Sequence, residues 1–277
     1  MTYSLKEKTK NLAKEYGFPP SRGLGQNFLV DENVVRKVVE AAEIEDNDIV
    51  LEIGPGLGAL TKSLTEKAKQ VVAVEKDPRM IKVLKNLFPE AGNLEILELD
   101  IRKFSPEKDF LAYKAVGNLP FYLTAPVIRR FLEVVEFKPQ QMVFVVQKEV
   151  AQRICARPPK MSILAVSVQF YAETKIISYI SKGSFWPQPK VDAAIIRITP
   201  FVKPNLAKEK MELFFKIVKA GFSQPRKQLA NNLSKKLELN RNETIAWLAK
   251  NKIQPERRAE TLTVENWISL LKSFKMD

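Results

Sequence analysis

The sequence predicts an α/β protein: a largely parallel β-sheet covered by helices, followed by a small all-α domain. Three observations lead to this prediction. Apolar runs of strand length alternate with amphipathic helical patterns from residue 31 onward, which is typical of a parallel sheet with helices on both faces. One of these runs leads directly into a glycine-rich turn over residues 52–58. Beyond residue 203 the strand pattern stops and only helical patterns follow.

The elements of the sheet domain follow in order from their periodicity. Asp31 is a good helix N-cap, and the valines that follow it fall on one face of a helix ending near Ala42. Pro78 stands in the first turn of a later helix, where proline is favoured. The predicted strands cover residues 49–53, 71–75, 94–99, 115–119 and 141–147. The other predicted helices cover residues 59–68, 78–87, 124–135 and 148–155.

The pattern changes in the later part of the chain. Residues 162–171, 175–179 and 191–199 are predicted to be strands with no long helix between them, which indicates an antiparallel edge. The C-terminal helices are predicted over residues 211–220, 226–237 and 243–250. We place the boundary so that residues 1–203 form the sheet domain and residues 204–277 form the helical domain.

The composition excludes several classes of function. Of the 277 residues, 45% are hydrophobic, which is enough for a packed core. The chain contains one cysteine, Cys155, and no histidine. A single cysteine forms no intramolecular disulfide, and the lack of imidazole excludes histidine-based triads, general bases and metal sites. We therefore expect no metal centre.

The charge is uneven along the chain. The formal net charge is +13, and residues 201–277 contribute +8 of it. A basic module beside a nearly balanced domain favours binding to a polyanion such as nucleic acid, with a solvated lysine-rich surface as the alternative. No apolar run is long enough to cross a membrane, and residues 1–10 contain no signal core. We therefore expect a cytoplasmic protein without a membrane partner.

The turn Glu52-Ile-Gly-Pro-Gly-Leu-Gly58 indicates a ligand site. Glycines let the backbone approach a ligand closely, and the N-terminus of the following helix favours negative charge. Gly54, Gly56 and Ala59 fit the loose dinucleotide-binding fingerprint. Glu75 ends the next strand, where it would bind ribose hydroxyls. This motif alone does not separate a nicotinamide cofactor from S-adenosylmethionine, and a purely structural turn is the remaining alternative.

Two further strand ends carry polar groups. Asp100 follows the third strand, where it would accept a hydrogen bond from an exocyclic adenine amine or simply cap a turn. The fourth strand ends in Asn118-Leu-Pro-Phe121. The Asn118 side-chain oxygen and the Pro120 carbonyl are two acceptors that can hold an amino group, and Phe121 offers a face for a planar base. Because these groups all fall at the C-terminal ends of strands, we expect them to form one site.

The ordered set of motifs resembles that of the ribosomal RNA adenine N6-dimethyltransferases, over about residues 22–270. The matching segments are Gly25–Leu29, Glu52–Gly56, Glu75, Asp100, Asn118–Phe121 and Phe185–Asp192. The segments similar to the small-subunit branch of that family are Gln147–Arg153, Gly221–Leu233 and Arg258–Leu262.

The resemblance implies a Rossmann-like, seven-stranded, S-adenosylmethionine-dependent fold with a small helical domain. In such a fold Gly54 would approach the methionine part of the cofactor, Glu75 would hold the ribose and Asp100 the adenine. Asn27 and Leu29 would close over the cofactor. The full set of cofactor-binding residues implied in this way is Asn27, Leu29, Gly54, Gly56, Glu75, Asp100 and Asn118.

The resemblance also implies the reaction: dimethylation of adenines at N6 in small-subunit (16S) ribosomal RNA during ribosome biogenesis, by a protein acting as a monomer. Asn118 and the Pro120 carbonyl would hold the target amine, and Phe121 and Phe185 would stack on the target adenine. The family commonly has tyrosine where Phe121 stands. The expected RNA-binding residues are Arg226, Lys227, Lys235, Lys236, Arg257 and Arg258.

Three alternatives stay open at this point. The first is a large-subunit ribosomal RNA adenine methyltransferase of the antibiotic-resistance type. The second is a non-catalytic ribosome assembly or transcription factor on the same fold, and the third is a nicotinamide-dependent dehydrogenase. The missing histidine favours methyl transfer, because an amine aligned with a sulfonium needs no strong base before attack.

Overall fold

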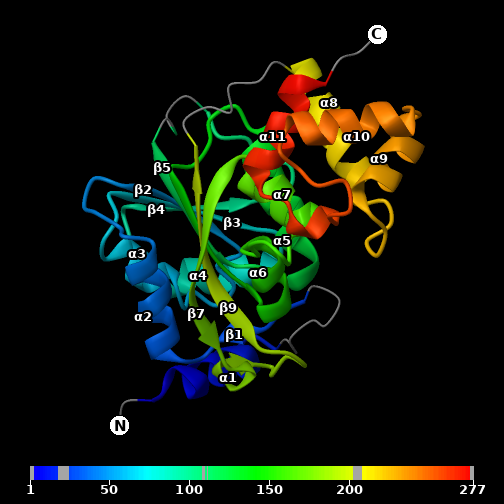
Figure 1. The fold of residues 1–277 in the computed structure, drawn as a ribbon. Coiled ribbons are helices and arrows are strands. Elements are labelled where there is room, and N and C mark those ends of the chain that lie inside the picture. The colour runs from blue at the N-terminus through cyan, green and yellow to red at the C-terminus, as the bar shows by residue number, and fades with distance from the viewer. Residues whose placement is uncertain (1–2, 18–24, 108–109, 111, 202–207, 275–277) are drawn as a thin grey trace. The chain divides into compact units, whose positions relative to one another are not determined.

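Runs of valine, isoleucine and leucine form the seven strands of one sheet in the computed structural model (Figure 1). The structure describes residues 3–17, 25–107, 110, 112–201 and 208–274. The chain divides into two compact units: Met1–Ala151 with Glu173–Pro200, and Gln152–Ala172 with Phe201–Asp277. The smaller unit therefore includes a segment that the sequence had placed in the sheet domain. The predicted boundary at residue 203 lies outside the described residues.

The sheet has the order β4-β3-β2-β5-β6-β9-β7. The first five of these strands pair in parallel, and β9 pairs with β6 in the antiparallel direction. The predicted α/β class and the predicted antiparallel strand near the edge are therefore confirmed. The strand bounds are β2 Ile49–Ile53, β3 Gln70–Glu75, β4 Leu94–Glu98, β5 Tyr113–Asn118, β6 Gln141–Gln147, β7 Ala172–Ile180 and β9 Ala193–Pro200.

Aspartate side chains cap two helices of the larger unit, and the first of these caps, Asp31, was predicted. The Asp31 carboxylate accepts a hydrogen bond from the Asn33 amide (3.0 Å) at the start of α2 (Glu32–Ala41), and the α2 valines belong to the same core cluster as Val50 and Val143 of the sheet. Asp77 caps α4 (Pro78–Leu87) in the same way. The remaining helices are α3 Thr61–Thr65, η2 Phe121–Leu123, α5 Thr124–Arg129, the π-helical turn η3 Arg130–Val134, α6 Lys148–Ile154 and η4 Lys182–Ser184.

A second, two-stranded sheet joins two distant segments of the chain. Strand β1 (Phe28–Leu29) pairs in the antiparallel direction with β8 (Phe185–Trp186). The Phe28 and Trp186 rings stack with centroids 6.4 Å apart. Strands this short carry no periodic signal, so the sequence did not predict them. The N-terminal helix α1 (Leu5–Glu15), which begins with a Ser4–Glu7 capping box, was also not predicted.

The prediction of a strand over residues 162–171 is wrong. Helix α7 (Ile163–Gln169) occupies this segment, and the Ser162 hydroxyl accepts a hydrogen bond from the Ala165 amide (3.2 Å) as its cap. The β-branched residues of this segment suggested a strand, but its buried positions follow a helical spacing: Ala165, Val166, Val168 and Gln169. Burial within the unit therefore decided the conformation against local propensity.

Helices form the smaller unit. The Phe170 ring, which follows α7, stacks on Phe214 with centroids 4.2 Å apart, and Trp267 is fully buried. The Asn232 amide donates to the carbonyls of Gly221 (2.7 Å) and Gln224 (3.0 Å), which fixes the turn before α9. The helices are α8 Lys208–Gly221, α9 Leu229–Leu237, α10 Arg241–Lys250, η5 Ala259–Thr261 and α11 Val264–Ser273. No helix among the described residues has the length and apolarity needed to cross a membrane.

The contact between β2 and β5 predicts a test of the fold. A Cβ atom on Gly117 would lie 2.6 Å from the Ile53 carbonyl oxygen, whereas a Cβ on Gly92 would meet no atom within 4 Å. We expect Gly117→Ala to destabilise the protein by about 2 kcal/mol or more in urea unfolding, because the two central strands must separate. The control Gly92→Ala should change stability by about 0.5 kcal/mol or less. Equal effects of the two substitutions would contradict this account of the sheet centre.

Candidate active site

A single cleft opens at the C-terminal ends of the central strands. The register pairs Ile53 of β2 with Gly117 of β5, so the residues that follow, Gly54 and Asn118, lie side by side. This is the point where the strand order reverses, and open α/β sheets bind ligands there. All ten predicted cofactor-binding and catalytic residues line this cleft: Asn27, Leu29, Gly54, Gly56, Glu75, Asp100, Asn118, Pro120, Phe121 and Phe185.

The glycine turn leaves space in the cleft floor. Gly54 has a φ of +67°, and a Cβ atom on it would project into open space. Gly56 has a φ of +56°, and a Cβ there would lie 3.1 Å from the Phe28 ring. Both positions need the left-handed backbone conformation that glycine adopts most easily. The turn therefore leaves room for a ligand directly above Gly54.

The Glu75 carboxylate is fixed by backbone amides. It accepts hydrogen bonds from the amides of Lys76 (2.7 Å), Asp77 (2.9 Å) and Gly56 (3.3 Å). Burial raises the pKa of Glu75, and these three N–H groups oppose that shift. Two of the three bonds reach Oε1, so Oε2 keeps an acceptor position that a hydroxyl group in the cleft can use.

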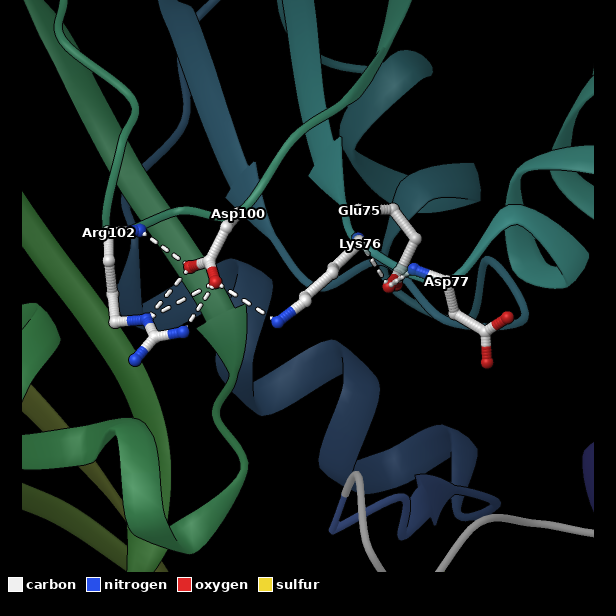
Figure 2. A network of polar contacts seen from close by, with 5 residues as sticks. All are labelled: Glu75, Lys76, Asp77, Asp100 and Arg102. Carbon is white, nitrogen blue, oxygen red and sulfur yellow. Dashed lines mark hydrogen bonds and ion pairs between the residues drawn. The ribbon is translucent and has the colours of Figure 1, made fainter.

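The Asp100 carboxylate is held by two cations (Figure 2). Arg102 donates from its backbone amide (3.0 Å), from Nε (3.0 Å) and from Nη2 (2.6 Å), and the Lys76 ammonium lies 3.2 Å from Oδ2. The guanidinium of Arg102 holds the pKa of Asp100 far below its usual range. Because these bonds use every acceptor position of the carboxylate, a ligand amine can bind Asp100 only when one donor gives way. The Lys76 ammonium makes one hydrogen bond to Asp100, and the Lys76 side chain is 60% exposed. It is therefore the donor that a ligand can displace most easily.

A hydrogen bond orients the Asn118 side chain. Its Nδ2 donates to the main-chain carbonyl of Asn27 (2.8 Å), while the Asn27 amide itself donates to the Gly25 carbonyl (3.1 Å). Within the described part of the chain, no group donates to Oδ1 of Asn118. The amide is thereby locked with its acceptor atom available to a ligand.

The remaining predicted groups stand around Asn118. The Pro120 carbonyl accepts a hydrogen bond from the Leu123 amide (2.8 Å), which leaves its second lone pair for another donor. Phe121 is half-buried in η2, whereas Phe185 is only 3% exposed because its backbone pairs with Leu29 in the two-stranded sheet. The cleft thus has one adaptable aromatic ring and one fixed ring.

The segment from Gly25 to Leu29 spans the cleft and is held at several points. The Gln26 amide donates to the Asp77 carboxylate (2.9 Å), and Asp77 in turn donates its backbone N–H to Glu75. Phe28 packs in a cluster with Leu57 and the α4 residues Met80 and Val83. The segment Gly25–Leu29, which the sequence showed only as part of the family resemblance, therefore connects Glu75 with Asn118. Glu75 is the carboxylate expected to bind ribose.

The predicted RNA-binding cations lie in two groups on the smaller unit. The exposed turn with Arg226 and Lys227 adjoins the segment of Arg257 and Arg258, because the Leu229 amide donates to the Arg257 carbonyl (2.7 Å). Lys235 and Lys236 lie in the last turn of α9, at its opposite end. The guanidinium of Arg257 binds both Thr261 oxygens, so this arginine serves the internal structure of its loop.

Among the cleft-lining residues that sequence reasoning missed are Lys76, Arg102 and Tyr122. Lys76 and Arg102 each stand one or two residues from a predicted carboxylate, Glu75 and Asp100 respectively. A basic residue next to a candidate binding carboxylate is a signal that could have identified them.

The arrangement fits S-adenosylmethionine. The space above Gly54, which a Cβ atom at this position would fill, accommodates the amino-acid part of the cofactor. The free acceptor position on Glu75 matches a hydroxyl group of the cofactor's ribose. Asp100 offers acceptors for an adenine amine once Lys76 yields. Among the described residues no group of three or more potential metal ligands occurs.

The sequence profile described as "Ribosomal RNA adenine dimethylase" matches residues 20–276. The chain belongs to this family. It is an S-adenosylmethionine-dependent methyltransferase, and the family resemblance expected from the motifs is confirmed.

Named relatives and solved structures agree with this assignment. A ribosomal RNA small subunit methyltransferase A from Dehalococcoides mccartyi (strain CBDB1) is 40% identical over 98% of this chain and 94% of its own length. The protein of that name from Clostridium botulinum (strain ATCC 19397 / Type A) is 39% identical over 94% of this chain and 95% of its own. The structure of the 23S rRNA methyltransferase ErmE matches with a TM-score of 0.75 at 26% identity, covering 89% of this chain and 99% of that one. A dimethyladenosine transferase from Plasmodium falciparum matches with a TM-score of 0.72 at 26% identity, covering 87% and 94%.

Glu52, the first residue of the glycine motif, is buried. Its burial predicts that the stability of the protein depends on pH. Its Oε2 accepts a hydrogen bond from Thr61 (2.7 Å), and burial raises the pKa of Glu52 to about 8. In the folded state Glu52 thus keeps its proton, whereas in the unfolded chain the same carboxyl group loses it above the ordinary pKa of 4.5. Stability should therefore fall as the pH rises from about 5 to about 8, by on the order of 1 kcal/mol per pH unit.

The substitution Glu52→Gln should remove this contribution. We expect the urea midpoint of the variant, followed by circular dichroism, to depend less on pH than that of the unmodified protein. The control Glu66→Gln changes an exposed glutamate and should keep the original pH dependence. Parallel pH profiles for Glu52→Gln and the unmodified protein would contradict a protonated Glu52.

Proposed function

We propose that this protein transfers methyl groups from S-adenosylmethionine to N6 of adenines in small-subunit ribosomal RNA, placing two on each target nitrogen. The observation that carries the proposal is the single cleft, in which Asn118, Pro120, Phe121 and Phe185 stand beside the groups that fit the cofactor. The names of relatives about 40% identical over nearly the whole chain support the small subunit as the substrate.

The target amine would be held by two oxygen acceptors. Asn118 Oδ1 and the second lone pair of the Pro120 carbonyl would each accept one N–H of the exocyclic amine. These bonds would draw the nitrogen toward tetrahedral geometry and aim its lone pair at the methyl group. The bound cofactor supplies an activated methyl group on a positively charged sulfur. Alignment of two reacting groups in this way can contribute about 7 kcal/mol or more to lowering the barrier.

The target adenine would be fixed by the two aromatic rings. A base inside a helix cannot reach the cleft, so the adenine must be unpaired or extruded. Phe185, fixed by strand pairing with Leu29, would form one wall, and the half-buried Phe121 would close on the other face. Each stack would contribute roughly 1–3 kcal/mol.

Cofactor binding would use Glu75 for the ribose and Asp100 for the adenine amine. Gly54 and Gly56 would lie along the methionine part, and the segment with Asn27 and Leu29 would cover it. The acceptor position needed on Asp100 would become available when Lys76 turns toward solvent.

The two parts of the chain would divide the work. Residues 1–203 would bind the cofactor and catalyse methyl transfer, and residues 204–277 would bind RNA through their excess of cations. Arg226, Lys227, Lys235 and Lys236 are exposed and would contact the phosphate backbone, and Arg258 would join them. We infer further that the protein acts as a monomer in the cytoplasm, where small ribosomal subunits mature.

A second candidate is methylation of large-subunit RNA, which the structural match to the 23S rRNA methyltransferase ErmE favours. The two candidates are separated by labelling. We expect label from S-adenosylmethionine to enter unmodified small subunits as N6,N6-dimethyladenine, detected by mass spectrometry of the digested RNA. Protein-free large-subunit RNA is the comparison substrate, and label confined to it would overturn the proposal in favour of the second candidate.

The proposed role of Asn118 predicts that the isosteric variant Asn118→Asp loses methylation activity. In Asn118→Asp a carboxylate oxygen would replace the N–H that donates to the Asn27 carbonyl 2.8 Å away, and two acceptors at that distance repel. We expect the methylation rate to fall by about 100-fold, because the acceptor is no longer aimed at the amine.

Titration calorimetry supplies the control for this variant. The affinity for S-adenosylmethionine should fall much less than the methylation rate, since Glu75, Asp100 and the glycine turn are unchanged and only the contribution of Asn118 and Asn27 to cofactor binding is disturbed. An aspartate variant that keeps most of its activity would show that any oxygen acceptor suffices and that the bond to Asn27 has no role in catalysis.

A further inference from the structure

Tyr122 lies beside the proposed target site without a role in it. It is the central residue of η2, directly after Phe121, and its side chain is 55% exposed. Among the large hydrophobic side chains that are exposed in the described part of the chain, Tyr122 is the one that lines the cleft. An aromatic ring held at the rim of a nucleic-acid-binding cleft and open to solvent is suited to stack on a base.

The ring is supported from the protein side. A Cβ atom on Gly25 would lie 3.4 Å from the Cε1 atom of Tyr122 and 3.3 Å from the Pro120 Cβ atom. Gly25 has a φ of +65°, so a glycine here lets the chain pass close to the ring. Gly25 thus lies close to one side of the ring, while more than half of the Tyr122 side chain stays accessible for stacking.

Two cations belong to the lining of the same cleft as this ring. Arg102 and Lys76 line the cleft, and their side chains are 55% and 60% exposed although both bind Asp100 (Figure 2). Bonding to Asp100 raises the pKa of Arg102, with a smaller electrostatic contribution from the Tyr122 phenol. One carboxylate shared by two cations leaves a net positive charge in this cluster.

We propose that Tyr122, Arg102 and Lys76 form a subsite for the nucleotide that adjoins the target adenine in the RNA strand. The Tyr122 ring would stack on the neighbouring base, and the two cations would bind the phosphate that links it to the target. The inference rests on the proposed function and adds the site that holds the strand while the adenine is in the cleft. When the cofactor's adenine amine takes the place of Lys76 on Asp100, the ammonium becomes available to the phosphate.

Steady-state kinetics with unmodified small subunits test the stacking part. We expect Tyr122→Leu to raise the KM for RNA by about tenfold, because a single base stack is lost. The maximal rate and the Kd for S-adenosylmethionine should change less, and Tyr122→Phe, which keeps the ring, should recover most of the RNA affinity. The matched control is Tyr179→Leu, an exposed tyrosine of β7 that lies outside the cleft lining and should have no effect on KM.

The salt dependence of RNA binding tests the phosphate part. We expect Lys76→Gln to reduce the slope of log Kd against log salt by about 0.7, the value for one contact with a single strand. Arg102 is left intact in this variant so that Asp100 keeps one cation. The control Lys62→Gln removes an exposed charge of α3 and should leave the slope unchanged.

The outcomes separate the subsite from the proposed function. If the unmodified protein methylates small subunits but Tyr122→Leu keeps its KM, the subsite is overturned and the function stands. A rise in the Kd for S-adenosylmethionine equal to the rise in KM would assign Tyr122 to the cofactor and also overturn the subsite. If the unmodified protein methylates no small-subunit RNA, the proposed function fails, and the subsite fails with it.

Discussion

The close pairing of β2 with β5 is the constraint on which the rest of the site depends. Gly117 brings the strands together so tightly that a Cβ atom would lie 2.6 Å from the Ile53 carbonyl oxygen. This register sets Gly54 beside Asn118, and therefore the space that would hold the methyl donor beside the proposed acceptor for the target amine. Reacting groups carried by neighbouring strands of one rigid sheet keep their separation without further support, which a reaction that depends on alignment requires.

The groups above the sheet are then fixed by hydrogen bonds that run between segments. Asn27 orients Asn118, Gln26 binds Asp77, and the Asp77 amide binds Glu75. These bonds run through one short segment, residues 26–27 directly before β1, to the two sides of the cleft. A displacement of that segment would disturb both sides at once, so cofactor binding and the orientation of the target amine would be physically coupled.

Sequence patterns predicted the sheet and the identity of the site because both depend on local signals. Asp31 caps a helix at the predicted place, and Gly54, Glu75, Asp100 and Asn118 stand at strand ends that a parallel sheet brings together. The features that sequence patterns did not predict depend on contacts between residues that are far apart in the chain. The pairing of Phe28 with Trp186 joins segments about 160 residues apart, and the helix at Ile163–Gln169 is decided by burial rather than by propensity. The bond from Lys76 to Asp100 is likewise a contact between side chains from two strand ends, which no periodicity reveals.

The state of the acidic groups explains how this cleft can work without histidine. Glu75 is tied to backbone amides, Asp77 is paired with Arg79 and Gln26, and Asp100 is held by two cations. The low pKa values of Asp77 and Asp100 make both carboxylates poor proton acceptors. Neither of these two is therefore poised as a general base toward an amine at Asn118, and the Glu75 carboxylate, whose pKa burial raises, would bind the ribose in the proposed complex. The chemistry that remains is one in which the nitrogen attacks first and loses its proton to water afterwards, and this order requires only that the lone pair be aimed correctly. In the proposed function the bond from Asn118 to Asn27 would provide that aim, so a chain without imidazole would lack nothing that the reaction needs.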